Sequence, residues 1–280
     1  MKIEPELRIR LASVFEPLKQ MASGSLPARG FLAKQLENAL ATSAGPVSVS
    51  APVVRAFASA SIEMWLRGVH TFVISCTLTE ASPIWASVTG YYASHYVMRA
   101  FAHTLGHFLL FRLKKVARLQ FAGGSYGCTV DPKTVRDREH VFYWRVVKDD
   151  RQFSVDPLFR RNVFDGDVSD AGHREHANYA DHIDRFPNLA TIQVDDIKDR
   201  IRRISQIPFD DPPIPRLQQF PAVESVQIVA YHRLVRFRQL LDEALEGKNR
   251  FWNVHREPPW VRDLMDFQLT EQGGLRSARN

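Results

Sequence analysis

The segment Val69–Phe111 contains only two charged side chains, Glu80 and Arg99, when histidine is counted as neutral. Such a segment could either cross a membrane or form the centre of a helical bundle. Arg99 and the histidines in its second half would be costly in hydrocarbon, and Pro83 interrupts the stretch. A helix that is apolar on nearly all sides is also typical of the middle of a large bundle. We therefore expect a buried helix and no association with a membrane.

One edge of this central helix, around Tyr91–Phe111, carries a polar stripe formed by His95, Arg99, His103 and His107. Positions four apart on an α-helix differ by only about 40° in direction. A guanidinium beside imidazoles can bind a phosphate and lower the pKa of a neighbouring histidine. The stripe is therefore a candidate catalytic site, with Arg99 as phosphate clamp and His103 as general acid or base. The alternative is a buried polar network satisfied by partners on other helices.

Apolar periodicity predicts a mainly helical chain. The expected helices are Glu4–Met21, Phe31–Thr42, Val53–Thr77, Pro83 to about Leu113, Asp195–Ile207, Leu217–Glu246 and a short one after Trp260. Val116–Phe121 and His140–Val147 are rich in β-branched and aromatic residues and flank a glycine-rich stretch. They predict two short strands, or one strand and a helix. The expected fold is a helical bundle with a loop-rich, partly β insertion.

These patterns divide the chain into three parts. Residues 1–50 hold the N-terminal helices, and 51–210 form a helical core with an insertion at about 116–172. Residues 211–280 hold a long helix and a tail.

The net charge is +6 and the isoelectric point about 9.4, which permits nucleic acid, an anionic membrane or an acidic partner. We expect each basic group to be a solvated face. The denser groups are Arg112/Lys114/Lys115/Arg118, Arg160/Arg161, Lys198/Arg200/Arg202/Arg203 and Arg233/Arg236/Arg238.

Two cysteines, Cys76 and Cys128, cannot make a disulfide framework or a four-cysteine zinc site. They indicate a reducing compartment, and the N-terminus lacks an apolar signal core, so we expect a cytoplasmic protein.

Two further clusters could carry chemistry. Gly172–His182 (GHREHANYADH) has three histidines, an arginine and two acids, so it could ligate a metal, clamp a phosphate or form a polar network. In that cluster we select Arg174 and His176 as supporting catalytic residues. The second cluster is Arg250–His255, a candidate for substrate binding or a surface loop. The sequence has no phosphate-binding glycine loop and no Gly-x-Ser-x-Gly motif, and we expect no cofactor and no metal.

The residues Thr89-Gly-Tyr-Tyr-Ala-Ser-His-Tyr-Val-Met-Arg-Ala-Phe101 resemble the central helix of HEPN domains, helical bundles of prokaryotic defence and toxin–antitoxin systems. Downstream, Arg174-Glu-His-Ala-Asn-Tyr179 is similar to the segment that often precedes their last helix. The resemblance covers about Val53–Ile207. It implies an antiparallel four-helix bundle, often a homodimer, that cleaves RNA without a metal or binds RNA, nucleotide or a partner protein.

Catalytic HEPN members use an arginine and a histidine separated by four to six residues. Three residues separate Arg99 from His103 and seven separate it from His107, whereas four separate Arg250 from His255, outside the matching region. Many members lack the motif and serve as binding or scaffold modules. Two main functions stay open: a metal-independent ribonuclease or RNA-binding protein, in which His95, Tyr179, Arg250 and His255 contact substrate, and a non-catalytic interaction protein. A third alternative is a metal-dependent hydrolase that uses His173, His176 and His182.

Overall fold

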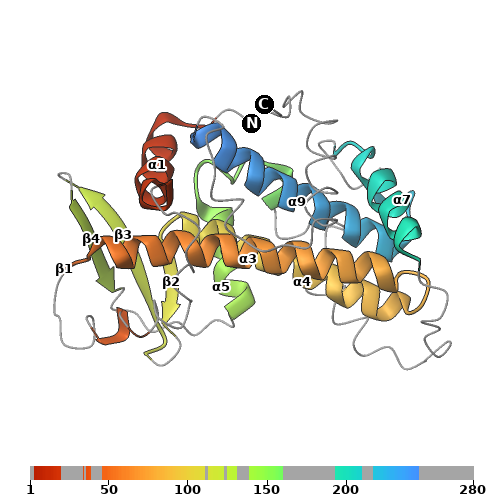
Figure 1. Ribbon diagram of the computed structural model, residues 1–280, viewed down its shortest axis with the longest axis horizontal. Coiled ribbons are helices and arrows are strands. Elements are labelled where there is room, and N and C mark those ends of the chain that lie inside the picture. Colours follow the sequence, from red (N-terminus) through yellow and green to blue (C-terminus); the bar gives the residue numbers. More distant parts are fainter. Residues whose placement is uncertain are drawn as a thin grey trace. The chain divides into compact units, whose positions relative to one another are not determined.

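The computed structural model has a mainly helical fold with one small antiparallel sheet (Figure 1). The helices described are α1 (Pro5–Lys19), α3 (Ala51–Leu78), α4 (Pro83–Thr104), α5 (Glu139–Asp149), α7 (Val194–Ser205), α9 (Ala222–Ala244) and the 3-10 helix η1 (Pro157–Phe159). The mainly α class expected from the sequence is thereby confirmed. The residues described are 3–19, 34, 36–38, 46–110, 113–122, 125–130, 139–159, 193–209 and 217–245.

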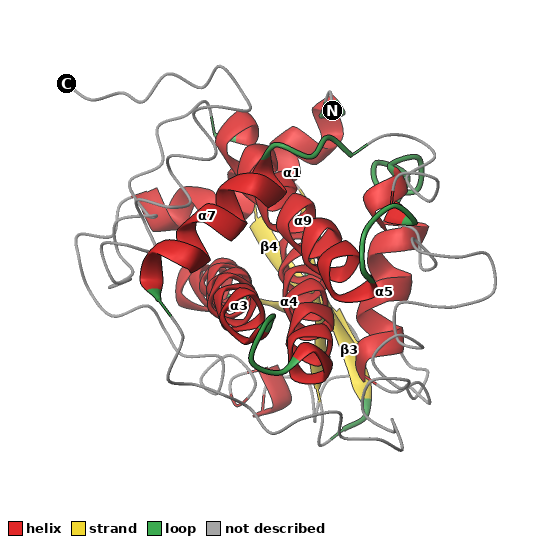
Figure 2. Ribbon diagram, turned by 90° about the vertical axis from the view of Figure 1, so that its right-hand side faces the viewer, coloured by secondary structure: helices red, strands yellow, loops and turns green. Residues whose placement is uncertain are grey.

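The long helices α3, α4 and α9 lie side by side (Figure 2). The bounds of α3 and α9 agree closely with the predicted helices, and α4 begins at the predicted residue, because apolar residues occur on nearly every turn of each. The absence of a side chain at Gly90 on α4 allows α9 to approach, since a methyl group there would lie 2.8 Å from Cγ1 of Val226. The hydroxyl of Ser75 on α3 donates a hydrogen bond to the carbonyl oxygen of Ala86 on α4 (2.6 Å).

The sheet contains β1 (Val47–Ser48), β2 (His107–Leu110), β3 (Lys115–Ala122) and β4 (Ser125–Val130). Their order is β1-β4-β3-β2, and every neighbouring pair is antiparallel. Phe108 from β2, Leu119 from β3 and Cys128 from β4 are buried on the inner face. On that face the ring of Phe108 packs edge-on against Phe57 of α3, 6.0 Å between centroids.

The central helix ends earlier than predicted. The sequence pattern extended it to about Leu113, but α4 ends at Thr104 and His107–Leu110 forms strand β2. The turn depends on Gly106, which has φ of +80°, a conformation that favours glycine. The Gly106 carbonyl then accepts a hydrogen bond from the N–H of Leu119 (2.8 Å), which begins the pairing of β2 with β3.

His140–Val147 lies within helix α5, so the strand interpretation of this segment is wrong and the alternative of a strand followed by a helix is closer. The buried aromatic residues Phe142, Tyr143 and Trp144 account for the β-like composition. Strands β1 and β4 were not predicted. The predicted helices Phe31–Thr42 and the one after Trp260 lie largely or wholly outside the described residues.

The chain forms two compact units. Unit 1 comprises Met1–Leu66, Tyr96–Val155 and Phe237–His255, and unit 2 comprises Arg67–His95, Asp156–Arg236 and Arg256–Asn280. In unit 1 the ring of Phe101 meets those of Phe153 (5.1 Å) and Phe237 (5.0 Å). In unit 2 Phe72 packs against Tyr231 (5.9 Å). The division into 1–50, 51–210 and 211–280 stays a prediction.

The helices within the described ranges are all too short or too polar to cross a membrane.

Candidate functional site

Arg99 lies on α4 and is only 5% exposed. Its Nη1 forms an ion pair with Oε1 of Glu139, in the first turn of α5. Its guanidinium carbon lies 4.9 Å from the ring centroid of Tyr143, one turn further along α5, within the range of a cation–π contact. The positive charge of Arg99 is therefore compensated by two side chains of α5.

His103 is completely buried one turn after Arg99. Its Nδ1 lies 2.9 Å from the main-chain oxygen of His107. Because a carbonyl oxygen can only accept, Nδ1 must carry the proton, and in the neutral ring the lone pair is on Nε2. The imidazole also stacks on Phe108 (5.1 Å) and meets Tyr143 edge-on (5.4 Å). His103 thus joins the end of α4 to strand β2.

Tyr143 contacts both polar residues of α4 and also the edge of the sheet. The N–H of Leu109 donates a hydrogen bond to its phenolic oxygen (3.4 Å). In an antiparallel ladder alternate residues point their main-chain groups away from the partner strand. The Gly106–Leu119 bond sets this alternation so that His107 and Leu109 point away from β3. His103 and Tyr143 therefore bond main-chain groups at the edge of β2.

The predicted site residues fall into three groups. Arg99 and His103 come together around Tyr143 in unit 1. His95 is 6% exposed and belongs to unit 2, where its ring stacks on Tyr91 at 6.5 Å between centroids. The remaining predicted residues lie outside the described residues: Arg174, His176, Tyr179, Arg250 and His255.

Sequence reasoning missed Glu139 and Tyr143. They follow Arg99 by about 40 residues, and no spacing in the sequence connects α5 with α4. Glu139 and Tyr143 lie four positions apart in the sequence. If His140–Val147 is recognised as helical, this spacing places them on one face of a helix, and that is the only available signal.

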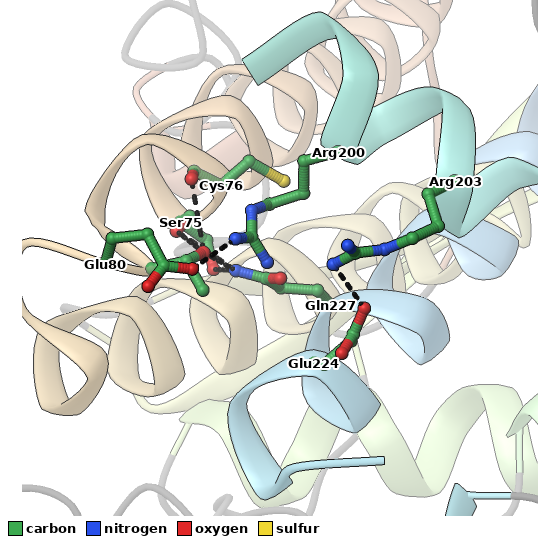
Figure 3. A network of polar contacts seen from close by, with 8 residues as sticks. Ser75, Cys76, Glu80, Arg200, Arg203, Glu224 and Gln227 are labelled. Carbon is green, nitrogen blue, oxygen red and sulfur yellow. Dashed lines mark hydrogen bonds and ion pairs between the residues drawn. The ribbon is translucent and has the colours of Figure 1, made fainter. Parts of the chain in front are cut away.

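A second polar network lies in unit 2 (Figure 3). The side-chain amide of Gln227 on α9 is completely buried and donates to the carbonyl oxygen of Ser75 (3.0 Å) and to the hydroxyl oxygens of Ser75 (3.1 Å) and Thr79 (2.8 Å). All three acceptors lie near the end of α3. No motif drew attention to Gln227, because a single glutamine in an apolar helix gives no sequence signal.

Helix α7 is held beside this network by two ion pairs (Figure 3). Arg200 pairs with Glu80 after α3 (2.5 Å), and Arg203 pairs with Glu224 in the first turn of α9 (2.7 Å). Burial raises the pKa of the nearby Cys76 thiol, while the Arg200 charge acts in the opposite direction. A thiol with a raised pKa is protonated at neutral pH and is a poor nucleophile.

From the sequence we expected the basic group Arg233/Arg236/Arg238 on α9 to be a solvated face. That prediction is wrong. Arg233 is completely buried, and its Nε donates to the carbonyl oxygen of Leu158 in η1 (2.7 Å). Arg236 pairs with Asp156 (3.2 Å), whose Oδ1 also accepts from the N–H of Leu158 (3.0 Å). These arginines connect α9 to η1 and are structural.

A metal site is not apparent within the ranges the structure describes, since no three histidine, cysteine, aspartate or glutamate side chains there gather closely enough to hold an ion. The cluster at Gly172–His182 lies outside those ranges.

Comparison with known proteins found no family model, no curated protein and no solved structure that matches this chain.

Proposed function

We propose that this protein is a non-catalytic, mainly helical interaction protein that binds RNA without cleaving it. The observation that carries the non-catalytic assignment is the burial of Arg99 and His103, each engaged by groups of the protein itself. The polar stripe then stabilises the junction between α4, β2 and α5.

Arg99 and His103 are not accessible to a substrate in this structure. A general acid or base must come within about 2.6–3.2 Å of the atom that exchanges the proton. His103 has no exposed surface, and Arg99 is 5% exposed and already paired with Glu139. A phosphodiester could reach these groups only if α5 moved away, which would break the ion pair and the contacts of Tyr143.

The RNA part of the proposal is supported by the net charge of +6 and by the resemblance of Thr89–Phe101 to HEPN domains. The same resemblance supports a role in a bacterial defence or toxin–antitoxin system, with a homodimeric state and a protein partner. Static light scattering of the purified protein tests the oligomeric state directly.

The decisive experiment combines an activity assay with a stability assay. Labelled single-stranded RNA is incubated with the wild type in EDTA and separately in Mg²⁺, and we expect it to stay intact. We expect Arg99→Ala to lower the free energy of unfolding by about 2–4 kcal/mol, since it leaves Glu139 without its cation. RNA cleavage by the wild type that disappears in Arg99→Ala, with the melting temperature unchanged, would overturn the proposal.

A metal-independent ribonuclease is the second candidate, and one observation favours it. Among the described residues, Nε and Nη2 of Arg99 have no hydrogen-bond acceptor, although both are buried. These N–H groups could bind a phosphate, and the Nε2 lone pair of His103 could accept a proton. The matched variant is Glu139→Gln: if the ion pair with Glu139 restrains a catalytic Arg99, this change should increase cleavage in EDTA.

A further inference from the structure

The outward face of the sheet has a composition unlike that of its inner face. Along β3, Ala117 and Leu119 are buried, whereas Arg118 and Gln120 are exposed. This alternation is expected for an antiparallel sheet with one face on the core and one in water. Leu109 of β2 and Val116 of β3 are paired on the outward face, and both are buried. The outward face is therefore covered near this pair and exposed at Arg118.

The strand register brings polar residues from different strands into rows on this open part. Arg118 lies directly opposite His107 of β2 on one side and Thr129 of β4 on the other. Cβ atoms of directly opposite residues are about 5 Å apart. A guanidinium is therefore flanked by an imidazole and a hydroxyl across three adjacent strands.

A second row runs beside the first. Gln120 lies opposite Gly127 of β4, which in turn lies opposite Ser48 of β1. Gly127 carries no side chain, and a methyl group placed there would meet nothing closer than 4.0 Å. The main chain between Gln120 and Ser48 can therefore be approached closely by a ligand.

The charged residues described on the outward face and in the adjoining β2–β3 turn are cationic. Among the described residues of the sheet and of this turn there is no aspartate and no glutamate. Arg118 lies on the outward face and Lys114 in the turn, whereas Lys115 belongs, by the same alternation, to the inner face. Lys114 is exposed at the turn. Together with the net charge of +6, the exposed cations at Arg118 and Lys114 favour an anionic partner.

We propose that this outward face, formed by Ser48, His107, Arg118, Gln120, Gly127 and Thr129, binds the phosphate backbone of single-stranded RNA. This rests on the proposed function and names the surface that performs it. Arginine, serine, threonine and glutamine are the side chains that commonly contact phosphate and sugar oxygens. The described part of the face has no phenylalanine, tyrosine or tryptophan for base stacking, so we expect contacts mainly to the backbone and little dependence on base sequence.

The test measures binding of a fluorescein-labelled, mixed-sequence single-stranded RNA by anisotropy at several salt concentrations. We expect the wild type to bind, and Arg118→Gln to weaken binding about tenfold and to reduce the salt slope by about one ion. Arg118→Glu should weaken it further. Circular dichroism and the melting temperature report whether each variant stays folded under the binding conditions. Thr129→Asp, on the neighbouring strand, supplies a second and independent variant.

The matched control is Arg151→Gln, since the Arg151 side chain is 90% exposed and lies away from the sheet in the sequence. It should bind RNA like the wild type. If the wild type binds RNA and both Arg118→Glu and Thr129→Asp bind equally well, the face is not the binding surface, while the proposed function stands. If the wild type fails to bind even at low salt, RNA binding itself is refuted. Preferential binding of polyglutamate over RNA would overturn the inference in favour of an acidic polypeptide.

Discussion

The main-chain N–H of Leu109 donates a hydrogen bond to the phenolic oxygen of Tyr143, 3.4 Å away, and both residues are buried. Tyr143→Phe keeps the ring beside Arg99 and His103 and removes the hydroxyl that accepts this bond. We expect a loss of about 1 kcal/mol in the free energy of unfolding, because a buried N–H is left unsatisfied. Chemical denaturation measures this loss.

Hydrogen exchange supplies the internal control for Tyr143→Phe. The amide of Leu109 should exchange faster, while that of Phe108, which points into the ladder with β3, should keep its protection. Equal protection of Leu109 in both proteins would show that Tyr143 does not stabilise the strand edge.

Gly106→Ala should destabilise the protein by about 2–3 kcal/mol. The residue has φ of +80°, and the new methyl group would lie 2.8 Å from the carbonyl oxygen of Leu119, so strain and steric overlap both act. Gly127→Ala is the matched control, because its nearest atom is 4.0 Å away, and it should change stability by less than about 1 kcal/mol. Thermal unfolding of both variants tests the contrast, and similar effects at the two positions would contradict it.

Gln227→Met preserves volume and removes an amide that donates to Ser75 and Thr79. We expect a cost of about 1–3 kcal/mol, since the buried acceptors lose a donor. Gln218→Met, at an exposed position before α9, should be neutral within about 0.5 kcal/mol. If the two variants melt at the same temperature, the α3–α9 network contributes no stability.

His232 should make the stability depend on pH. Burial lowers the pKa of its imidazole from 6.5 to about 4, although the hydrogen bond from Nε2 to the carbonyl oxygen of Ile207 (2.7 Å) acts in the opposite direction. Below pH 6.5 the unfolded chain gains a proton that the folded protein accepts only near pH 4. The stabilisation is therefore complete above pH 6.5 and falls by about 3 kcal/mol as the pH drops to 4.

The control for this pH effect is His232→Gln, whose amide can still donate to Ile207 but does not titrate. Denaturation of both proteins between pH 7 and 4 isolates the histidine, because all other titrating groups are shared. An identical pH slope for the two proteins would refute the assignment.

The long helices could be predicted from sequence because their burial repeats with the helical period. Val53–Thr77 and α3 (Ala51–Leu78) nearly coincide, since most residues of α3 face protein and few positions carry charge. The end of α4 could not be predicted in the same way. Apolar residues continue through Leu110, so the sequence pattern does not show where the helix ends. The positive φ of Gly106 turns the chain there, and the residues that follow form strand β2.

The candidate site was predicted only in part, for a related reason. Arg99 and His103 share a helix face, and that follows from their spacing. What they do depends on Glu139 and Tyr143, whose approach is set by tertiary packing of α5. The sequence left a catalytic pair and a buried network open, and the burial of both residues favours the network.

The pairing of β1 with β4 has a consequence for how the chain folds. Strands β2, β3 and β4 follow one another, so a meander can close through short loops. Val47, in contrast, meets Cys128 across a long separation that includes all of α3 and α4. Long-range contacts carry a higher entropic cost of loop closure and form slowly. We therefore expect the meander to nucleate before β1 joins, so that conservative substitutions at Val47 accelerate unfolding and leave the folding rate unchanged.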